Sequence, residues 1–175
     1  DDPLRMMRAA RFASQLNFEI APEVLSSMKD LAHRISIISA ERVRDEFTKI
    51  MMSANPRIGI TLLVDSGLAD IVLPEIPKLR LEVDEHHHHK DVYEHSITVL
   101  EQAMEHEERL GGPNLVIRLA ALLHDIGKPK TRAFIEGGGV SFHHHEVVGA
   151  RLAKKRLQAL RFDNDTIDAV ELLTM

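Results

Sequence analysis

The sequence predicts an all-α protein, and three observations support this prediction. Residues that favour helices (Leu, Ala, Ile, Met and Glu) are plentiful, while aromatic residues make up only 4% of the chain and Trp is absent. Apolar residues recur at helical spacing along most of the chain. These runs begin at Pro, Ser or Asn and end near Gly or Pro, as helices commonly do. One stretch, residues 130–143, alternates around three glycines and predicts a short β-hairpin or a loop.

Length and composition describe an ordinary globular protein. The 175 residues are enough for one large domain or two small ones, and 44% are hydrophobic and 28% charged. No apolar run approaches the ~20 residues of a membrane helix, and without a basic segment followed by a hydrophobic one at its start, no signal peptide is expected. The absence of cysteine excludes disulfides and thiolate chemistry and is compatible with the cytoplasm, where we expect the protein. The formal charge of −5 argues against nonspecific wrapping around nucleic acid.

Four helices are predicted in the first part of the chain, over about 3–16, 22–32, 38–51 and 56–67. Ser39 is expected to cap the third helix, and Asn55 with Pro56 the fourth. The segment from Leu73 to Pro77 contains two prolines and predicts the joint between two domains. The expected core positions are Leu4, Met7, Phe12 and Leu16 in the first helix, Val43, Phe47, Ile50 and Met51 in the third, and Ile58, Leu62, Leu63 and Leu68 around the fourth.

The second part begins with four consecutive histidines at residues 86–89. They look like a purification tag but stand inside the chain, and a solvated loop is their expected state. A long amphipathic helix is predicted over residues 91–110, because Gly111, Gly112 and Pro113 close it. Asn114 is expected to cap the following helix. Two more helices are predicted over residues 147–160 and from Asn164 onward.

An adjacent His-Asp pair, His124 and Asp125, ends an apolar helical run before Gly127 and Pro129 stop it. Neighbouring side chains on a helix diverge by about 100°. In the last turn before a break, however, both can converge on one metal ion. An imidazole and a carboxylate are ligands suited to Zn, Mn, Fe or Mg. If a His-Asp dipeptide stood alone in a sequence, a simpler interpretation would be favoured, namely a buried His beside its neighbouring Asp.

Other histidines in the sequence favour the interpretation of His124 and Asp125 as metal ligands. His95 lies upstream, and residues 142–146 contain three more histidines before a Glu. This set resembles the HD-domain superfamily of metal-dependent phosphohydrolases, which have an early His, a later His-Asp doublet and further His or Asp ligands. The resemblance implies that His95, His124 and Asp125 are metal ligands. His143 or His145 lies where two-metal members keep additional ligands. Some members of the superfamily have lost activity and serve only as scaffolds.

Residues 1–13 have a second characteristic pattern, in which Arg5, Arg8 and Arg11 form a slanting row on the first helix behind Asp1 and Asp2. Taken alone, this would be a solvated charged face. The pattern resembles the neck motif of class II tRNA nucleotidyltransferases and bacterial poly(A) polymerases. The resemblance implies that Asp2 and Arg5 pair with the edge of the incoming nucleotide base and that Arg8 supports it, with Arg11 in the same nucleotide-binding set.

The start of the third helix, residues 38–42, also resembles this family, in which its Glu and Arg tie the helices together beside the nucleotide pocket. The resemblance therefore covers nearly the whole chain in order. It implies a fragment with a helical neck and body over residues 1–80, which recognises nucleotide and tRNA, and an HD domain over 81–175 that is truncated at its C-terminal end. The parent would be a CCA-adding tRNA nucleotidyltransferase or a poly(A) polymerase that acts on RNA 3′ ends with ATP or CTP. Its catalytic head is absent, so this chain alone should not polymerise nucleotides.

An active HD domain would hydrolyse phosphomonoesters or 2′,3′-cyclic phosphates, as the resemblance implies. A divalent metal ion (Mg, Mn, Zn, Ni or Fe) would polarise the phosphate and lower the pKa of a bound water. His95, His124, Asp125 and His145 would hold it, and Asp168 or a His beyond Met175 would be a last ligand. The residues expected to meet phosphate oxygens as catalytic groups are Lys128 and His145.

Two alternatives stay open. In the first, the HD domain is a metal-free scaffold that positions tRNA, which predicts no hydrolysis but retained RNA binding. In the second, the chain is a free-standing nucleotide phosphohydrolase whose first 80 residues are a helical accessory. That alternative predicts hydrolysis of free nucleotides and no effect of Asp2→Ala or Arg5→Ala on any ligand.

Overall fold

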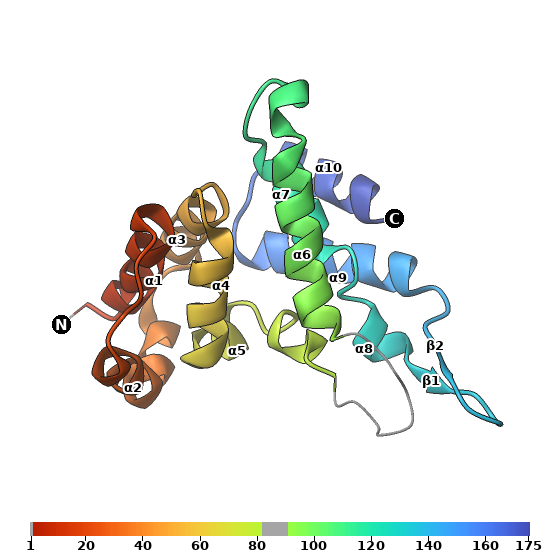
Figure 1. Ribbon diagram of the computed structural model, residues 1–175, viewed down its shortest axis with the longest axis horizontal. Coiled ribbons are helices and arrows are strands. Elements are labelled where there is room, and N and C mark those ends of the chain that lie inside the picture. Colours follow the sequence, from red (N-terminus) through yellow and green to blue (C-terminus); the bar gives the residue numbers. More distant parts are fainter. Residues whose placement is uncertain (1, 82–90) are drawn as a thin grey trace. The chain divides into compact units, whose positions relative to one another are not determined.

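A computed structural model of the chain describes residues 2–81 and 91–175 (Figure 1). Within these ranges the secondary structure is helical apart from one two-stranded hairpin, which confirms the predicted all-α class. The predicted loop over His86–His88 lies outside the described residues. None of the helices in the described part is long and apolar enough to cross a membrane. The chain forms two compact units, one running to Pro74 with the addition of Ala159–Phe162, the other comprising Glu75–Gln158 and Asp163–Met175.

The first unit is built around α1 (Leu4–Leu16), which packs against both α3 (Ala40–Met51) and α4 (Pro56–Asp65). The close approach of α1 and α4 depends on Gly59, because a Cβ there would lie 2.5 Å from Ser14 Oγ and 3.2 Å from the Ala10 carbonyl oxygen of α1. The Gly59 amide donates to the Ser14 hydroxyl at 2.6 Å. The remaining elements of this unit are α2 (Pro22–Leu31), the 3-10 helix η1 (Ala32–Ile37) and α5 (Leu68–Val72).

The predicted core of this unit is partly correct. All four expected positions of α3 are buried, and the Ser39 hydroxyl accepts from the Arg42 amide as predicted for a cap. On α1, however, Phe12 and Leu16 are 44% and 67% exposed, and the second half of the buried face is formed by small residues instead. The reason is that α1 touches two helices at once, which favours a face of small side chains. The residues that join Leu4 and Met7 there are Met6, Ala10, Ala13 and Ser14.

The fourth helix departs from prediction at two points. Asn55 makes no side-chain cap for α4. Its amide instead donates to the Ser14 carbonyl at 3.4 Å, which links the two helices. Ile58 and Leu62 are only half-buried, whereas Leu63 and Leu68 are buried as expected. The buried side of α4 is thus rotated toward α1.

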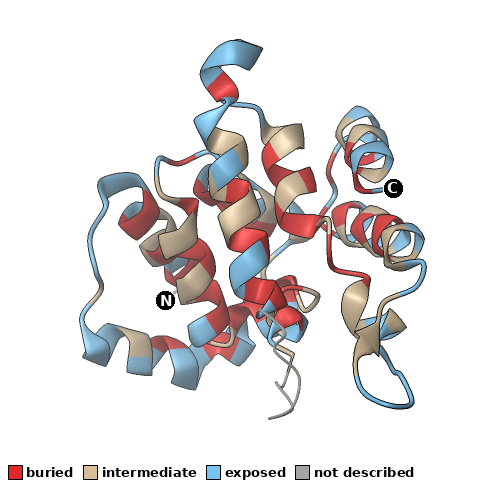
Figure 2. Cartoon of the chain, turned by 45° about the vertical axis from the view of Figure 1, so that its right-hand side comes forward, coloured by how far each residue is buried: buried red, intermediate tan, exposed pale blue. Residues whose placement is uncertain are grey.

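The second unit is centred on α7 (Leu115–Leu123), which packs against α6 (Val92–Glu105) and α10 (Asn164–Thr174). Burial follows stripes along the helices, with exposed residues on the opposite faces (Figure 2). Asn114 caps α7 by accepting from the Ile117 amide at 3.1 Å, as predicted. The other elements are η2 (Pro77–Leu79), η3 (Glu107–Leu110), α8 (Lys128–Thr131), β1 (Ala133–Phe134), β2 (Val140–Ser141) and α9 (His145–Ala159).

The helix predicted over residues 91–110 is interrupted, because α6 ends at Glu105 and a 3-10 turn follows. Within that turn, Glu107 forms a buried two-point pair with Arg118 of α7. The distances are 2.6 Å from Arg118 Nε to Glu107 Oε1 and 2.8 Å from Nη2 to Oε2. A buried carboxylate needs such a partner. The interruption turns Glu107 toward α7 and therefore satisfies both charges.

The alternating stretch forms a hairpin rather than a loop. Its strands are antiparallel, with Ala133 opposite Ser141 and Phe134 opposite Val140. The three tip glycines, Gly137–Gly139, have φ of 90°, 108° and 106°, a region that glycine adopts without strain. The glycines are thus required by the turn.

Candidate metal centre

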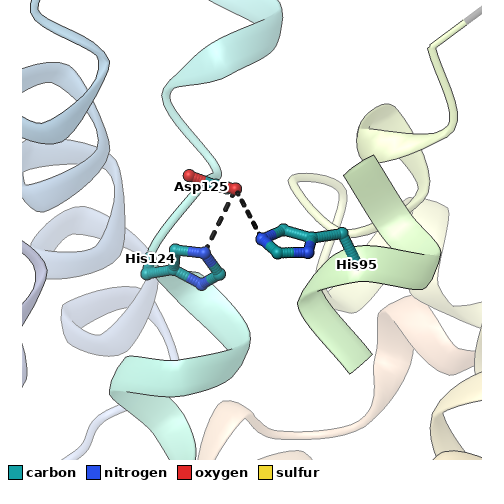
Figure 3. A group of neighbouring side chains, drawn as sticks. All are labelled: His95, His124 and Asp125. Atoms are coloured by element: carbon teal, nitrogen blue, oxygen red, sulfur yellow. Dashed lines mark ion pairs between the residues drawn. The ribbon is translucent and has the colours of Figure 1, made fainter. Parts of the chain in front are cut away.

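Three helices bring four site residues of the second unit together. His95 lies on α6, His124 and Asp125 at the end of α7, and His145 at the start of α9. Figure 3 shows His95 and His124 directed toward Asp125 from two sides. The side chains of an adjacent His-Asp pair meet because the helix ends at His124, as the sequence predicts.

Asp125 is the centre of this cluster and is only 3% exposed as a side chain. Its Oδ2 lies 3.1 Å from His124 Nε2 and 3.8 Å from His95 Nε2, and its Oδ1 lies 3.5 Å from His145 Nε2. One ligand atom from each of His95, His124 and Asp125 lies within 4.8 Å of the other two. Lys128 Nζ donates to Asp125 Oδ2 at 2.8 Å.

Backbone carbonyls orient two of the imidazoles. His124 Nδ1 is 2.6 Å from the Ala121 oxygen, and His145 Nδ1 is 3.0 Å from the Phe142 oxygen. A carbonyl can only accept, so the proton of each neutral ring is assigned to Nδ1. In that neutral form Nε2 keeps the lone pair that can bind a metal ion, whereas the hydrogen bond from His124 Nε2 to the Asp125 carboxylate requires the doubly protonated ring. Metal-binding histidines are commonly fixed in this way.

The charges at the cluster follow from burial and hydrogen bonding. Burial raises the pKa of Asp125, but hydrogen bonds with His124 and Lys128 outweigh this effect and bring the pKa down to about 2. Burial lowers the pKa of His124, but its hydrogen bonds to Asp125 and to the Ala121 carbonyl outweigh that and raise the pKa. Asp125 is therefore ionised at neutral pH, which is the form that binds metal ions.

A close contact between two glycines holds His145 near this carboxylate. A Cβ on Gly127 would collide with the His145 carbonyl oxygen and lie 2.6 Å from the Gly149 nitrogen. Gly127 has an ordinary φ of −77°, so the requirement is one of space. The sequence indicated Gly127 only as a helix stop. Gly149, in the first turns of α9, was the sequence signal that could have revealed the contact.

Other predicted candidates lie outside the cluster. His143 is exposed, and Asp168 is exposed on α10 and is not part of the group. Among the described residues, His95, His124 and Asp125 form the one group of three or more His, Cys, Asp or Glu side chains close enough to hold a metal ion. With His145 nearby, the donors are imidazole nitrogen and carboxylate oxygen, a set that fits divalent transition metals.

The predicted nucleotide-binding residues lie in the first unit and are tied to α3. Asp2 Oδ1 accepts from the Leu4 amide at 3.0 Å, and Oδ2 accepts from Arg42 Nη2 at 2.6 Å. The Leu4 amide and then the Arg42 guanidinium lower the pKa of Asp2. Arg5 is exposed on α1. Asp2 is thus fixed at the start of the helix by the Arg of the second family-like motif.

Glu46 is a residue that sequence reasoning missed. Its buried carboxylate lies 3.6 Å from Arg8 Nε and 3.0 Å from Arg11 Nε. A signal was present, because Glu46 stands within the apolar stripe of α3, next to Phe47. A carboxylate at a core position requires a cationic partner. The row of arginines on α1 supplies two.

Comparisons with known proteins bear on both parts of the chain. A family model described as "Probable RNA and SrmB- binding site of polymerase A" matches residues 17–79, and one described as "HD domain" matches residues 92–174. The chain is 37% identical over 166 residues to the A-adding tRNA nucleotidyltransferase of Deinococcus radiodurans. The aligned region covers 91% of this chain and 38% of that protein.

Two proteins named "Multifunctional CCA protein" are also similar. The one from Neisseria meningitidis serogroup A is 34% identical over 178 residues, covering 99% of this chain and 40% of that protein. The one from Azoarcus sp. strain BH72 is 35% identical over 174 residues, covering 96% of this chain and 40% of that protein. The chain thus spans about two fifths of the length of these relatives.

Proposed function

The chain belongs to the family of tRNA nucleotidyltransferases and poly(A) polymerases, and we propose that it recognises RNA and nucleotide through residues 1–80 and hydrolyses phosphate esters at the metal centre within residues 81–175. The two family models, which match one segment in each part, support this division. The observation that carries the hydrolytic part is the convergence of three histidine Nε2 atoms on the buried Asp125 carboxylate.

A divalent metal ion held by His95, His124, Asp125 and His145 would polarise a phosphate oxygen and make water a better nucleophile. Lys128 keeps an ammonium group at the cluster, where it can contact an anionic phosphate once the metal neutralises Asp125. His95 is 45% exposed as a side chain, which leaves the cluster accessible from solvent. These features support a phosphomonoesterase or a 2′,3′-cyclic phosphodiesterase.

In the complete enzyme, the neck residues would bind ATP or CTP while the RNA 3′ end is extended. Asp2 and Arg5 would contact the base edge, because a carboxylate accepts and a guanidinium donates in one plane. Arg8 and Arg11 would support the nucleotide. The Asp2–Arg42 contact supports this role, since it fixes the carboxylate before a nucleotide arrives.

Metal content tests the hydrolytic proposal. We expect the purified, untagged chain to hold about one equivalent of a transition metal by plasma mass spectrometry, and Asp125→Ala to lose it because the central carboxylate is removed. Asp168→Ala is the matched control, an exposed Asp of the same unit that should retain the metal. Wild-type chain with metal should then release phosphate from p-nitrophenyl phosphate or open a 2′,3′-cyclic nucleotide.

A metal-free scaffold is the alternative that one contact favours. The Lys128 ammonium already neutralises the Asp125 carboxylate at 2.8 Å, so the cluster is compatible with the absence of a metal. That alternative predicts no bound metal after reloading and no hydrolysis, with RNA binding unchanged in Asp125→Ala. Such a result would contradict the phosphohydrolase proposal and leave the RNA-binding part intact.

A further inference from the structure

The β1–β2 hairpin of the second unit presents an aromatic ring to solvent. Phe134 is 66% exposed, and the guanidinium carbon of Arg132 lies 5.4 Å from the centre of its ring. In Figure 1 the hairpin projects beyond α8 and α9 of its own unit. A single exposed apolar residue is common on protein surfaces. The position and charge of this hairpin distinguish it from such a case.

Both ends of the hairpin lead to residues that contact the candidate metal centre. The chain enters it from α8, which begins with Lys128, and leaves it at Phe142. The Phe142 carbonyl orients His145, and the Phe142 ring lies 5.6 Å from the Lys128 ammonium. Phe134 pairs with Val140, two residues before Phe142. At ~3.3 Å per strand residue, the exposed ring is therefore roughly 7 Å along the hairpin from the edge of the cluster.

The charge between the cluster and the ring is positive. Three cations, Lys128, Lys130 and Arg132, precede Phe134, and the one acidic residue between 128 and 142 is Glu136 near the tip. An exposed aromatic ring on a segment that is rich in cations matches a ligand with flat bases and phosphates. The ~7 Å offset corresponds to about two stacked nucleotides at ~3.4 Å each.

We propose that the hairpin is a base-binding arm of the metal centre, in which Phe134 stacks on a base of a single-stranded RNA end. The terminal phosphate of that RNA lies at the Asp125 cluster, and Lys128, Lys130 and Arg132 face the phosphates between. Arg132 lies over the Phe134 ring on one side, and the proposed base stacks on the other. The inference rests on the proposed function, because it takes the cluster as the phosphate site, and it names single-stranded RNA ends as the substrate class.

Photo-crosslinking tests the arm without relying on hydrolysis. The probe is a short single-stranded RNA with a 3′-phosphate and a 4-thiouridine two nucleotides from that phosphate. We expect its crosslink to the whole chain to map, by mass spectrometry, to the hairpin peptide around Phe134. Phe134→Ala should lower the crosslink yield at this peptide about five- to hundredfold, the usual effect of removing one stacking aromatic. Phe134→Trp should retain it.

Ile135→Ala is the matched control, because Ile135 is a neighbouring apolar residue that is 52% exposed. It should leave the yield unchanged. Crosslinks confined to residues 2–74, or a yield at the hairpin that is the same in Phe134→Ala, would overturn the proposal. A change of oligomeric state in Phe134→Ala without any change in the crosslink would overturn it in favour of contact with a second copy.

Hydrolysis separates this proposal from the function on which it rests. Phe134→Ala should lower kcat/KM for removal of the 3′-phosphate from the RNA and leave kcat/KM for p-nitrophenyl phosphate unchanged, since the small ester does not reach the ring. Equal values for wild type and Phe134→Ala on both substrates would overturn the arm but leave the phosphohydrolase standing. Crosslinking that depends on Phe134 without any hydrolysis would support the arm and contradict the phosphohydrolase.

Discussion

At the scale of single residues, Glu46 shows how one buried charge organises a neighbouring helix. It lies between Val43 and Ile50 on the buried face of α3, and its carboxylate faces Arg8 and Arg11 of α1. Arg8 remains 41% exposed as a side chain, whereas Arg11 is 14% exposed. Glu46 therefore holds two arginines of the proposed nucleotide-binding row in place, one of them still accessible to a ligand.

Replacing Glu46 by Gln should destabilise the first unit by about 1–3 kcal/mol, because the Arg11 guanidinium would lose the anionic partner of its buried Nε. Urea unfolding followed by circular dichroism measures this change. Asp45→Asn, at a carboxylate of the same helix that is 60% exposed, should change the free energy of unfolding by less than about 0.5 kcal/mol. Equal stability of the two variants would contradict the role assigned to Glu46.

At the scale of elements, the turn after α7 and the first turns of α9 depend on contact between backbones. Gly127 of the turn faces Gly149 of α9, and the chain between carries His145 into the cluster. Any side chain at Gly127 would separate the two segments. The orientation of His145 is thus set by a position that has no side chain.

Gly127→Ala should lower the free energy of unfolding by more than about 3 kcal/mol, because the added methyl group meets backbone atoms that cannot move aside. The same variant should lose bound metal as His145 is displaced. Gly149→Ala is the graded comparison: its nearest contact is 3.2 Å, and about 1 kcal/mol of helix propensity is gained. We expect it to be near neutral. Denaturation and metal analysis of both variants would show the contrast, and similar losses in the two would count against the close contact.

The helices also show which structural features can be predicted from the sequence. Ser39 and Asn114 were predicted as caps because a cap is local chemistry between a side chain and an amide three residues on. The exposure of Phe12 was not predicted, because α1 packs against two helices and the choice of face depends on both. Asn55 likewise contacts a distant carbonyl instead of its own helix.

At the scale of the whole chain, the grouping of the candidate metal ligands was predictable and its surroundings were not. His95, His124 and Asp125 could be assigned from a family-like pattern, and the structure brings them together. The two carbonyls that orient His124 and His145 carry no sequence signature, since every residue has a carbonyl. The break after Glu105 also escaped prediction, because the reason for it, Arg118, lies beyond the end of the helix.

The Glu107–Arg118 pair makes the stability of the second unit depend on pH. The hydrogen bond from Arg118 lowers the pKa of Glu107 below its usual 4.5, against the opposing effect of burial. Because the pKa is lower in the folded state, the unfolded state binds the proton more tightly. The contribution of the pair is therefore complete above about pH 4.5 and is lost as the pH falls through the folded-state pKa.

Glu107→Gln should therefore lower the free energy of unfolding at pH 7 by about 3–5 kcal/mol, because the buried Arg118 loses its partner. It should also flatten the decline that wild type shows below about pH 4.5, since the titrating group is gone. Urea unfolding by circular dichroism across this range measures both effects. Glu108→Gln, its exposed neighbour, should retain the steep decline of wild type. Parallel pH profiles for Glu107→Gln and wild type would mean that other carboxylates control acid unfolding and that the pair serves only to place η3 against α7.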